Sequence, residues 1–191
     1  MTNFPLIDVL QQYPQFWLVS TALLSLLVGS FLNLVIHRLP IAMQQEWQQE
    51  CRVLLELPAS NQQLSSPALA SIAWPASHCP QCQTPLKAWH NIPIISYLFL
   101  RGKCAFCNTS ISQRYPLIEL LTASLGLMIA WLLGPSIATV MTLLLMYMLV
   151  ALSFIDLDHK LLPDQLTLPL LWLGLAVNSF GLVTDLQGAF W

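Results

Sequence analysis

Four cysteines in two CxxC pairs are the first residues of this sequence whose type and spacing could do chemistry. The pairs are Cys79-Pro-Gln-Cys82 and Cys104-Ala-Phe-Cys107, with 21 residues between them. Two such pairs on two tight turns can converge on one tetrahedral ion, and zinc suits four thiolates because it has no redox chemistry. The spacing therefore predicts a structural zinc site, closed to catalysis, that folds a small module over residues 79–107.

Other interpretations of the cysteines stay open at this point. Two disulfides would suit an oxidising compartment, whereas a thioredoxin-like redox motif would need a surrounding βαβ pattern, which we do not find. His78 and His90 are close enough in sequence to replace a cysteine as a ligand, although four cysteines already complete the site. We interpret the remaining cysteine, Cys51, as a packing residue.

A second candidate site is the segment from Asp156 through Asp158 to Asp164, which holds three carboxylates and a histidine within nine residues. A calcium loop would need Gly at its sixth position and Glu at its twelfth, where the sequence has Leu161 and Thr167. A charged turn between two membrane helices, with Asp164 as a helix cap, is one interpretation that remains. A catalytic aspartyl site is the other, and it needs a second carboxyl, since one acts as base and the other as acid.

The elements that must position these residues are apolar helices. The chain is 56% hydrophobic and only 8% charged, whereas a soluble domain carries about 25% charged residues. Four stretches are long enough to cross a bilayer, and their only charge is Glu119; they are residues 17–36, 117–133, 136–155 and 165–184. In lipid the backbone must satisfy its own hydrogen bonds. We therefore predict an all-α membrane protein with four transmembrane helices and a small cytosolic four-cysteine zinc module.

The basic residues predict the orientation of these spans. Six of the seven lysines and arginines lie between the first and second spans, and the seventh, Lys160, lies between the third and fourth. Loops rich in Lys and Arg stay in the cytosol. We therefore expect residues 37–116 and 156–164 inside, and residues 1–16, the Gly134–Pro135 turn and the end at 185–191 outside. A reducing cytosol then disfavours the disulfides.

The flanks of the first span indicate a retained anchor. Asp8 precedes it and no basic residue does, which is the reverse of a signal peptide. We expect Pro40 to end this helix, residues 41–57 to form a separate short helix, and residues 58–78, rich in Ser, Pro and Ala, to be an irregular linker. We find no internal repeat, and no basic run that would suggest nucleic acid as a partner.

Several stretches, taken in order, resemble the prepilin peptidases, bifunctional leader peptidase/N-methyltransferases of the GxGD aspartyl protease class. The stretches are residues 29–40, the CxxC pairs with residues 90–97 between them, residues 111–123 and residues 154–164. The resemblance implies that Asp156 is the first catalytic aspartate, with Asp158 and Asp164 as supporting residues. It also implies the bacterial cytoplasmic membrane, type IV prepilins or pseudopilins of type II secretion as substrates, and S-adenosylmethionine as methyl donor, with no residue assigned to methyl transfer.

One departure from the family's pattern concerns the second catalytic aspartate, which lies in a GxGD motif on a later span. No two of the seven glycines here are separated by one residue, so the motif is absent. We expect this chain to be a fragment or a truncated gene product that lacks peptidase activity by itself. The alternative function is a non-catalytic, zinc-containing membrane scaffold for pilus or secretion assembly. A transporter is disfavoured because no span carries an ionisable residue at its centre.

Overall fold

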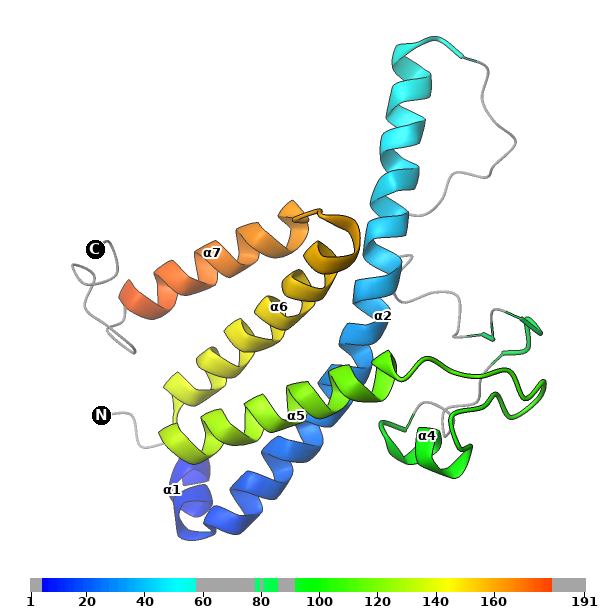
Figure 1. Ribbon diagram of the computed structural model, residues 1–191. Helices are drawn as coiled ribbons and strands as arrows, with labels where there is room; N and C mark the ends of the chain where they lie inside the picture. The colour runs from blue at the N-terminus through cyan, green and yellow to red at the C-terminus, as the bar shows by residue number, and fades with distance from the viewer. Residues whose placement is uncertain (1–4, 58–77, 80, 86–91, 180–191) are drawn as a thin grey trace.

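The computed structural model describes residues 5–57, 78–79, 81–85 and 92–179, and most of these residues lie in helices. Its helices, in chain order, are α1 (Pro5–Gln12), α2 (Pro14–Leu54), α4 (Ile95–Phe99), α5 (Arg114–Leu133), α6 (Ile137–His159) and α7 (Asp164–Ser179) (Figure 1). The described residues contribute only two isolated β-bridges, His78 with Pro85 and Lys103 with Ser110. The predicted all-α class is confirmed.

Three helices are long and apolar enough to cross a membrane: α2, α5 and α6. They coincide with the first three predicted spans. The described part of α7 has 16 residues, fewer than the roughly 17–25 of a spanning helix. Residues 180–184, which would complete the fourth predicted span, lie outside the described residues, as does Asp185. The fourth span stays a prediction.

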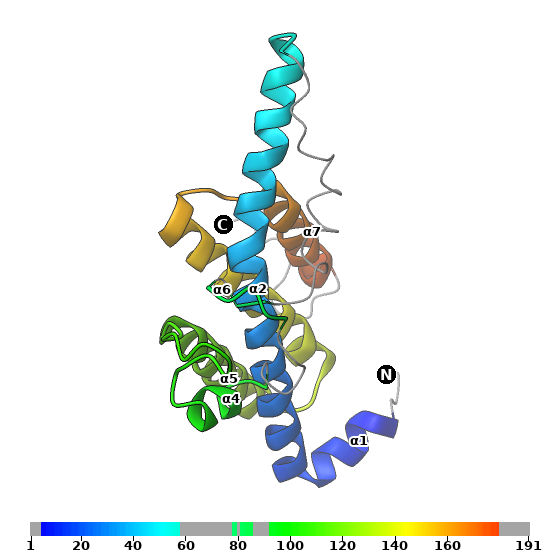
Figure 2. The same cartoon turned by 90° about the vertical axis from the view of Figure 1, so that its right-hand side faces the viewer.

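Hydrogen bonds between the helices fix their directions. The Trp17 indole donates to the Ala130 carbonyl at 3.2 Å, and the Asn33 amide donates to the Tyr115 carbonyl at 3.1 Å. The start of α2 thus lies beside the end of α5, and the two helices are antiparallel. The chain reverses direction at the Gly134 turn, so α6 runs back alongside α2 and α5 (Figures 1 and 2). The beginning of α5 and the end of α6 therefore lie at the same end of the bundle.

Small residues let α2 and α5 approach each other closely. They recur at i and i+4 on both helices, as Ser25 and Gly29 on α2 and Thr122 and Gly126 on α5. A Cβ at Gly29 would lie 2.9 Å from the Glu119 Cα, and one at Gly126 would lie 2.9 Å from the Ser25 Cβ. Such small-xxx-small stripes are how membrane helices gain packing contacts where lipid supplies no hydrophobic drive.

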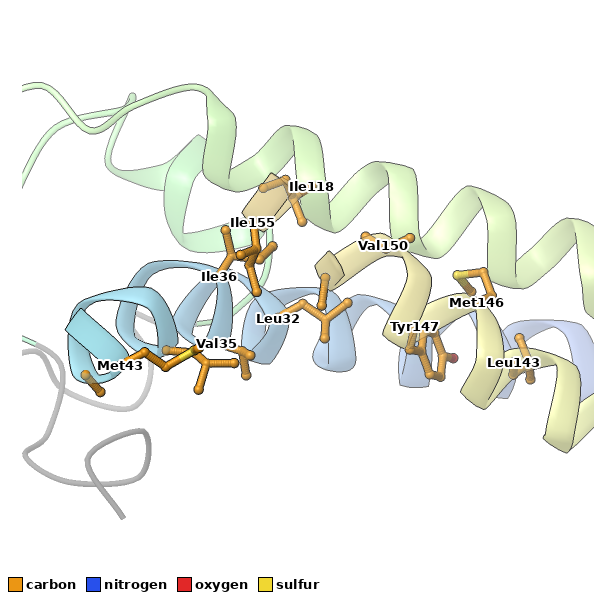
Figure 3. Packing of buried hydrophobic residues seen from close by; sticks show 13 residues of the cluster. Leu32, Val35, Ile36, Met43, Ile118, Leu143, Met146, Tyr147, Val150 and Ile155 are labelled. Carbon is orange, nitrogen blue, oxygen red and sulfur yellow. The ribbon is translucent and has the colours of Figure 1, made fainter. Parts of the chain in front are cut away.

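The core lies between α2, α5 and α6. Ile36, Ile118 and Ile155, one from each helix, are almost fully buried. Figure 3 shows them together, with Leu32 and Val150 beside them and Leu143, Met146 and Tyr147 further along α6. This packing holds the three helices as one unit at the end where α5 begins and α6 ends.

The first helix does not end at Pro40, as we had expected. Helix α2 continues to Leu54 and so includes residues 41–54 of the predicted short helix 41–57 as its extension, which projects beyond the other helices (Figures 1 and 2). A proline inside a helix costs about 3 kcal/mol, because it removes one hydrogen bond and clashes with the preceding turn. Here Leu39, Ala42 and Met43 on both sides of Pro40 are buried in the core cluster, so tertiary packing keeps the helix continuous.

Candidate functional site

The first CxxC pair forms a tight turn closed by backbone hydrogen bonds. The Cys79 N–H donates to the Thr84 carbonyl at 3.1 Å, and the Gln83 N–H donates back to the Cys79 carbonyl at 2.9 Å. Gln83 has a φ of +54°, which turns the chain after Cys82. Across this turn the backbone N–H groups of Cys82 and Gln81 approach the Cys79 sulfur.

The second CxxC pair repeats this turn. The Cys104 N–H donates to the Thr109 carbonyl at 2.8 Å, and the Asn108 N–H donates to the Cys104 carbonyl at 3.1 Å. Asn108 has a φ of +57°, the counterpart of Gln83. Both turns therefore share the pattern Cys-x-x-Cys-(Gln or Asn)-Thr, a short internal repeat that our sequence analysis missed.

The two turns bring all four sulfur atoms together. The Sγ atoms of Cys79, Cys82, Cys104 and Cys107 lie within 4.8 Å of one another, and those of Cys79 and Cys107 are 3.8 Å apart. Four sulfurs placed about 2.3 Å from one ion in a tetrahedron would be about 3.8 Å apart. The predicted convergence is confirmed, and the quartet has the donor set and spacing to hold a metal ion. His90 lies outside the described residues.

Threonines of the two turns favour the thiolate forms of the second cysteine in each pair. Hydrogen bonds from the Thr109 hydroxyl, 3.3 Å from Cys107 Sγ, and from the Thr109 backbone lower the pKa of Cys107 to about 6. Thr84 acts in the same way and lowers the pKa of Cys82. Since the thiolate is the form that binds metal, the two threonines favour metal binding by Cys82 and Cys107.

The aspartate segment begins on the last turn of α6. Asp156 is exposed there, and its carbonyl accepts a hydrogen bond from the N–H of Lys160, which ends the helix in a left-handed conformation with a φ of +52°. Helix α7 then starts at Asp164, and the carbonyl of Pro163 accepts the N–H groups of its first turn. Asp164 is the first residue of α7, and α6 ends at His159, before Pro163.

Asp158 is the one carboxylate of this segment with an ion-pair partner among the described residues. Arg114, the first residue of α5, donates to Asp158 Oδ1 from Nη1 at 2.8 Å, and Nη2 lies 2.5 Å from Oδ2. In the described part of the chain, the cysteines form the only group of three or more metal-ligating side chains that converges. Asp156, Asp158 and Asp164 therefore do not gather as a cation site.

Sequence reasoning missed the surroundings of Glu119, which we had noted only as a lone charge within a span. This carboxylate is buried, and its Oε2 accepts a hydrogen bond from the Ile94 N–H at 2.8 Å. It lines a cavity of about 400 Å³ between α2, the Ile94–Leu100 segment and the start of α5. The presence of a charge in an apolar span was the only signal in the sequence, because the partner residue lies in the loop before α4.

Comparison with known families gives two matches along the chain. Residues 23–133 match the Bacterial Peptidase A24 N-terminal domain, and residues 143–191 match the Type IV leader peptidase family. The first match includes the four-cysteine module, and the second includes the aspartate segment.

Three similar curated proteins all bear the name prepilin leader peptidase/N-methyltransferase. The prepilin leader peptidase/N-methyltransferase of Stutzerimonas stutzeri is 50% identical over 97% of this chain and 63% of the relative. The protein of that name from Pseudomonas aeruginosa is 48% identical over 97% of this chain and 62% of the relative. The Neisseria gonorrhoeae protein is 50% identical over 88% of this chain and 58% of the relative.

The chain thus spans about three fifths of the length of these relatives. No solved structure matches it. The resemblance noted in the sequence is confirmed, since the match to the amino-terminal domain alone covers more than half of the chain. The chain belongs to the bacterial peptidase A24 family of type IV leader peptidases.

Proposed function

We propose that this chain is the amino-terminal part of a prepilin leader peptidase/N-methyltransferase. The complete enzyme cleaves leader peptides from type IV prepilin-like proteins at the cytosolic face of the membrane and methylates the new amino terminus. The observation that carries the proposal is identity of about 50% over nearly the whole chain to relatives of that name. The four-cysteine module and the aspartate segment lie within the matched residues.

Asp156 is the first catalytic aspartate in this proposal. It lies on the last turn of α6, where it is exposed and can meet a second carboxylate from a part of the enzyme that follows. In an aspartyl peptidase, one carboxylate takes a proton from the attacking water and the other donates a proton to the leaving group. Asp158 and Asp164 support the segment, Asp158 through Arg114 and Asp164 at the start of α7.

In this proposal, peptidase activity requires more than the 191 residues of this chain. The GxGD motif that carries the second aspartate is absent from the sequence. One carboxyl cannot act as base and acid in the same step. The 191 residues by themselves should therefore cleave nothing, even with Asp156 intact.

The chain lies in the bacterial cytoplasmic membrane with its amino terminus outside. This orientation is supported by the basic residues, since Arg114 at the start of α5 and Lys160 after α6 mark the same end of the bundle, whereas the Gly134 turn lies at the other. A prepilin has a basic leader in the cytosol and an apolar helix in the bilayer. Its scissile bond would then arrive at the end of the bundle that carries Asp156.

The cofactors of the proposal are a structural zinc ion and S-adenosylmethionine. The four cysteine sulfurs would fill a tetrahedral shell, so the ion would stabilise the module and leave no position for substrate. S-adenosylmethionine, the methyl donor, enters through the family alone, and we assign none of the residues described in the structure to it. The second candidate function is a non-catalytic zinc-containing scaffold, which the absent GxGD motif favours for the isolated chain.

A chimaera tests the proposal. Residues 1–191 are joined to the part of the Stutzerimonas stutzeri relative that follows the matched region, and the product is incubated in membranes with a type IV prepilin and S-adenosylmethionine. Mass spectrometry should show a shortened pilin that carries one added methyl group at its amino terminus. A chimaera that inserts in the membrane and binds zinc but leaves the prepilin intact, while the relative itself cleaves it, would favour the scaffold.

A further inference from the structure

Glu119 carries a buried carboxyl group that neither the four-cysteine module nor the aspartate segment accounts for. Only 7% of the residue is exposed, although it lies on the second turn of a helix that can cross a membrane. Ionisable residues in such positions are costly and mark functional sites. Its carboxylate has two protein partners, the Ile94 N–H at 2.8 Å and the Ser30 hydroxyl on α2. Both partners are neutral groups, so neither of them supplies a cation to this carboxyl group.

The segment that donates to Glu119 is held in a strained conformation. Ile94 has a φ of +56°, a left-handed value that β-branched residues rarely adopt. Strain of this kind costs about 1–3 kcal/mol and persists where the surroundings enforce it, often at ligand-binding sites. Here the hydrogen bond to Glu119 fixes Ile94 directly before α4. The turn therefore faces α2 and α5 instead of solvent.

The segment between α4 and α5 packs against α4 and forms one wall of the cavity together with it. A Cβ at Gly102 would lie 2.8 Å from the Tyr97 hydroxyl, so the glycine permits close packing on this ring. The Ile111 N–H donates to the Gly102 carbonyl at 2.7 Å. Because Gly102 comes two residues before Cys104, the second cysteine turn is anchored directly behind this wall.

The cavity enclosed by these elements combines apolar walls with one carboxylate. Its volume is about 400 Å³, which suits a small ligand or one or two residues of a peptide. Leu27, Phe31 and Leu34 of α2 form one side, and Tyr97 and Leu100 the other. None of the described residues that line it is Lys, Arg or His. Tyr115 and Pro116, which follow Arg114, also line the cavity, so the cavity adjoins the end of the bundle where Arg114 pairs with Asp158.

We propose that this cavity binds the free α-amino group of the cleaved substrate, with the Glu119 carboxylate as counter-ion and the apolar walls around the first side chains. The inference rests on the proposed function, because leader cleavage is what creates a new amino terminus on an apolar segment. A primary ammonium complements the site: it carries the positive charge that the lining lacks, and a charge-assisted hydrogen bond to a carboxylate is stronger than a neutral one.

A binding experiment separates this role from a structural one. Two dye-labelled leucine-rich tetrapeptide amides are compared, one with a free α-amino group and one with an acetylated amino terminus, and their affinities for the 191-residue chain in detergent are measured by fluorescence anisotropy. The free amine should bind at least about tenfold more tightly, the equivalent of about 1.4 kcal/mol. Equal affinities for the two peptides would overturn the proposal without any variant.

Variants then locate the preference. Glu119→Gln should abolish the preference for the free-amine peptide over the acetylated one. Glu50→Gln, which removes an exposed carboxylate from the extension of α2, should retain this preference. A preference for the free amine that survives in Glu119→Gln would overturn the proposal. If Glu119→Gln does not fold, Leu27→Trp is used instead, since it places a bulky indole ring at the exposed edge of the cavity. It should weaken binding of the free amine about tenfold, and unchanged binding would contradict the site.

The readout is independent of leader cleavage. The peptides need neither a scissile bond nor a methyl donor, so an inactive chimaera would refute the proposed function whatever the binding result. A chimaera that cleaves and methylates equally well with Glu119→Gln, together with peptides that bind alike, would refute the amine site alone.

Discussion

Arg114 and Asp158 form a bidentate ion pair that joins the start of α5 to the end of α6, although 44 residues separate them in the sequence. The Arg114 guanidinium also lies over the Phe154 ring, 5.4 Å from its centroid. These contacts involve the residues two positions before and two positions after Asp156. They hold the last turn of α6 against α5 and so fix the position of the proposed catalytic aspartate.

Arg114→Lys should slow leader cleavage by the chimaera about tenfold and change its unfolding free energy by less than about 1 kcal/mol. Lys keeps the charge but cannot make two parallel hydrogen bonds to one carboxylate. The side chains are 40% and 29% exposed, and ion pairs at such positions stabilise folding by only about 0–1 kcal/mol. Cleavage rates and thermal unfolding are measured, with Arg52→Lys on the exposed extension of α2 as control. Cleavage at the parental rate in Arg114→Lys would refute this role.

The four-cysteine module should contain about one zinc ion per chain, and Cys79→Ser should remove it. Three thiolates cannot fill the tetrahedral shell that a structural site requires. Elemental analysis of freshly purified, reduced protein measures the metal. Cys51→Ser is the matched control and should retain zinc, because Cys51 lies outside the sulfur cluster. Cys51 is exposed on α2, so our interpretation of it as a packing residue was wrong. Parental protein without zinc would contradict the assignment.

Gly126→Ala should destabilise the bundle by about 1–3 kcal/mol, the usual cost of overpacking. The added Cβ would overlap Ser25, whose hydroxyl is already hydrogen-bonded to Tyr147 at 2.7 Å. Thermal unfolding in detergent provides the measurement. Gly174→Ala on α7 is the control, because its Cβ would meet nothing within 4 Å and Ala favours helix by up to about 1 kcal/mol. Equal melting temperatures for the two variants would argue against close packing of α2 on α5.

A reporter fused after Gly134 should be external, and one fused within residues 60–75 should be cytosolic. Arg114 begins α5 and Gly134 follows its end, so about 30 Å of helix separates them. The distribution of the basic residues predicts that the Arg114 end is in the cytosol. Alkaline phosphatase and green fluorescent protein fusions measure the two sides. The reverse pattern would overturn the orientation and with it the argument for reduced cysteines.

Features set by local composition could be predicted from the sequence. Three of the four predicted spans match helices that are long and apolar enough to cross a membrane, because long apolar stretches have few alternatives in a bilayer. The cysteine cluster was found because metal ligands in two tight turns leave a regular spacing. The repeat of Gln83-Thr84 at Asn108-Thr109 was also present in the sequence, but it is too short to detect without the matching hydrogen bonds of the two turns.

Features that depend on distant contacts could not be predicted. Proline usually ends or kinks a helix. Only the burial of the neighbours of Pro40 in the core explains why α2 continues through this residue. The pairing of Arg114 with Asp158 depends on how α5 and α6 pack against each other. Likewise, Glu119 receives a hydrogen bond from Ile94, 25 residues earlier. Nothing in the spacing of these residues indicates their contact.

The most direct test of the central claim is leader cleavage by the chimaera with Asp156→Asn. Asn keeps the size and polarity of the side chain but cannot ionise or pass a proton. Cleavage should be abolished while membrane insertion and zinc content remain unchanged, and Asp158→Asn should reduce it much less. Undiminished cleavage in Asp156→Asn, or cleavage by the isolated 191-residue chain that this substitution does not remove, would show that another group is catalytic and that the aspartate segment is only a charged turn.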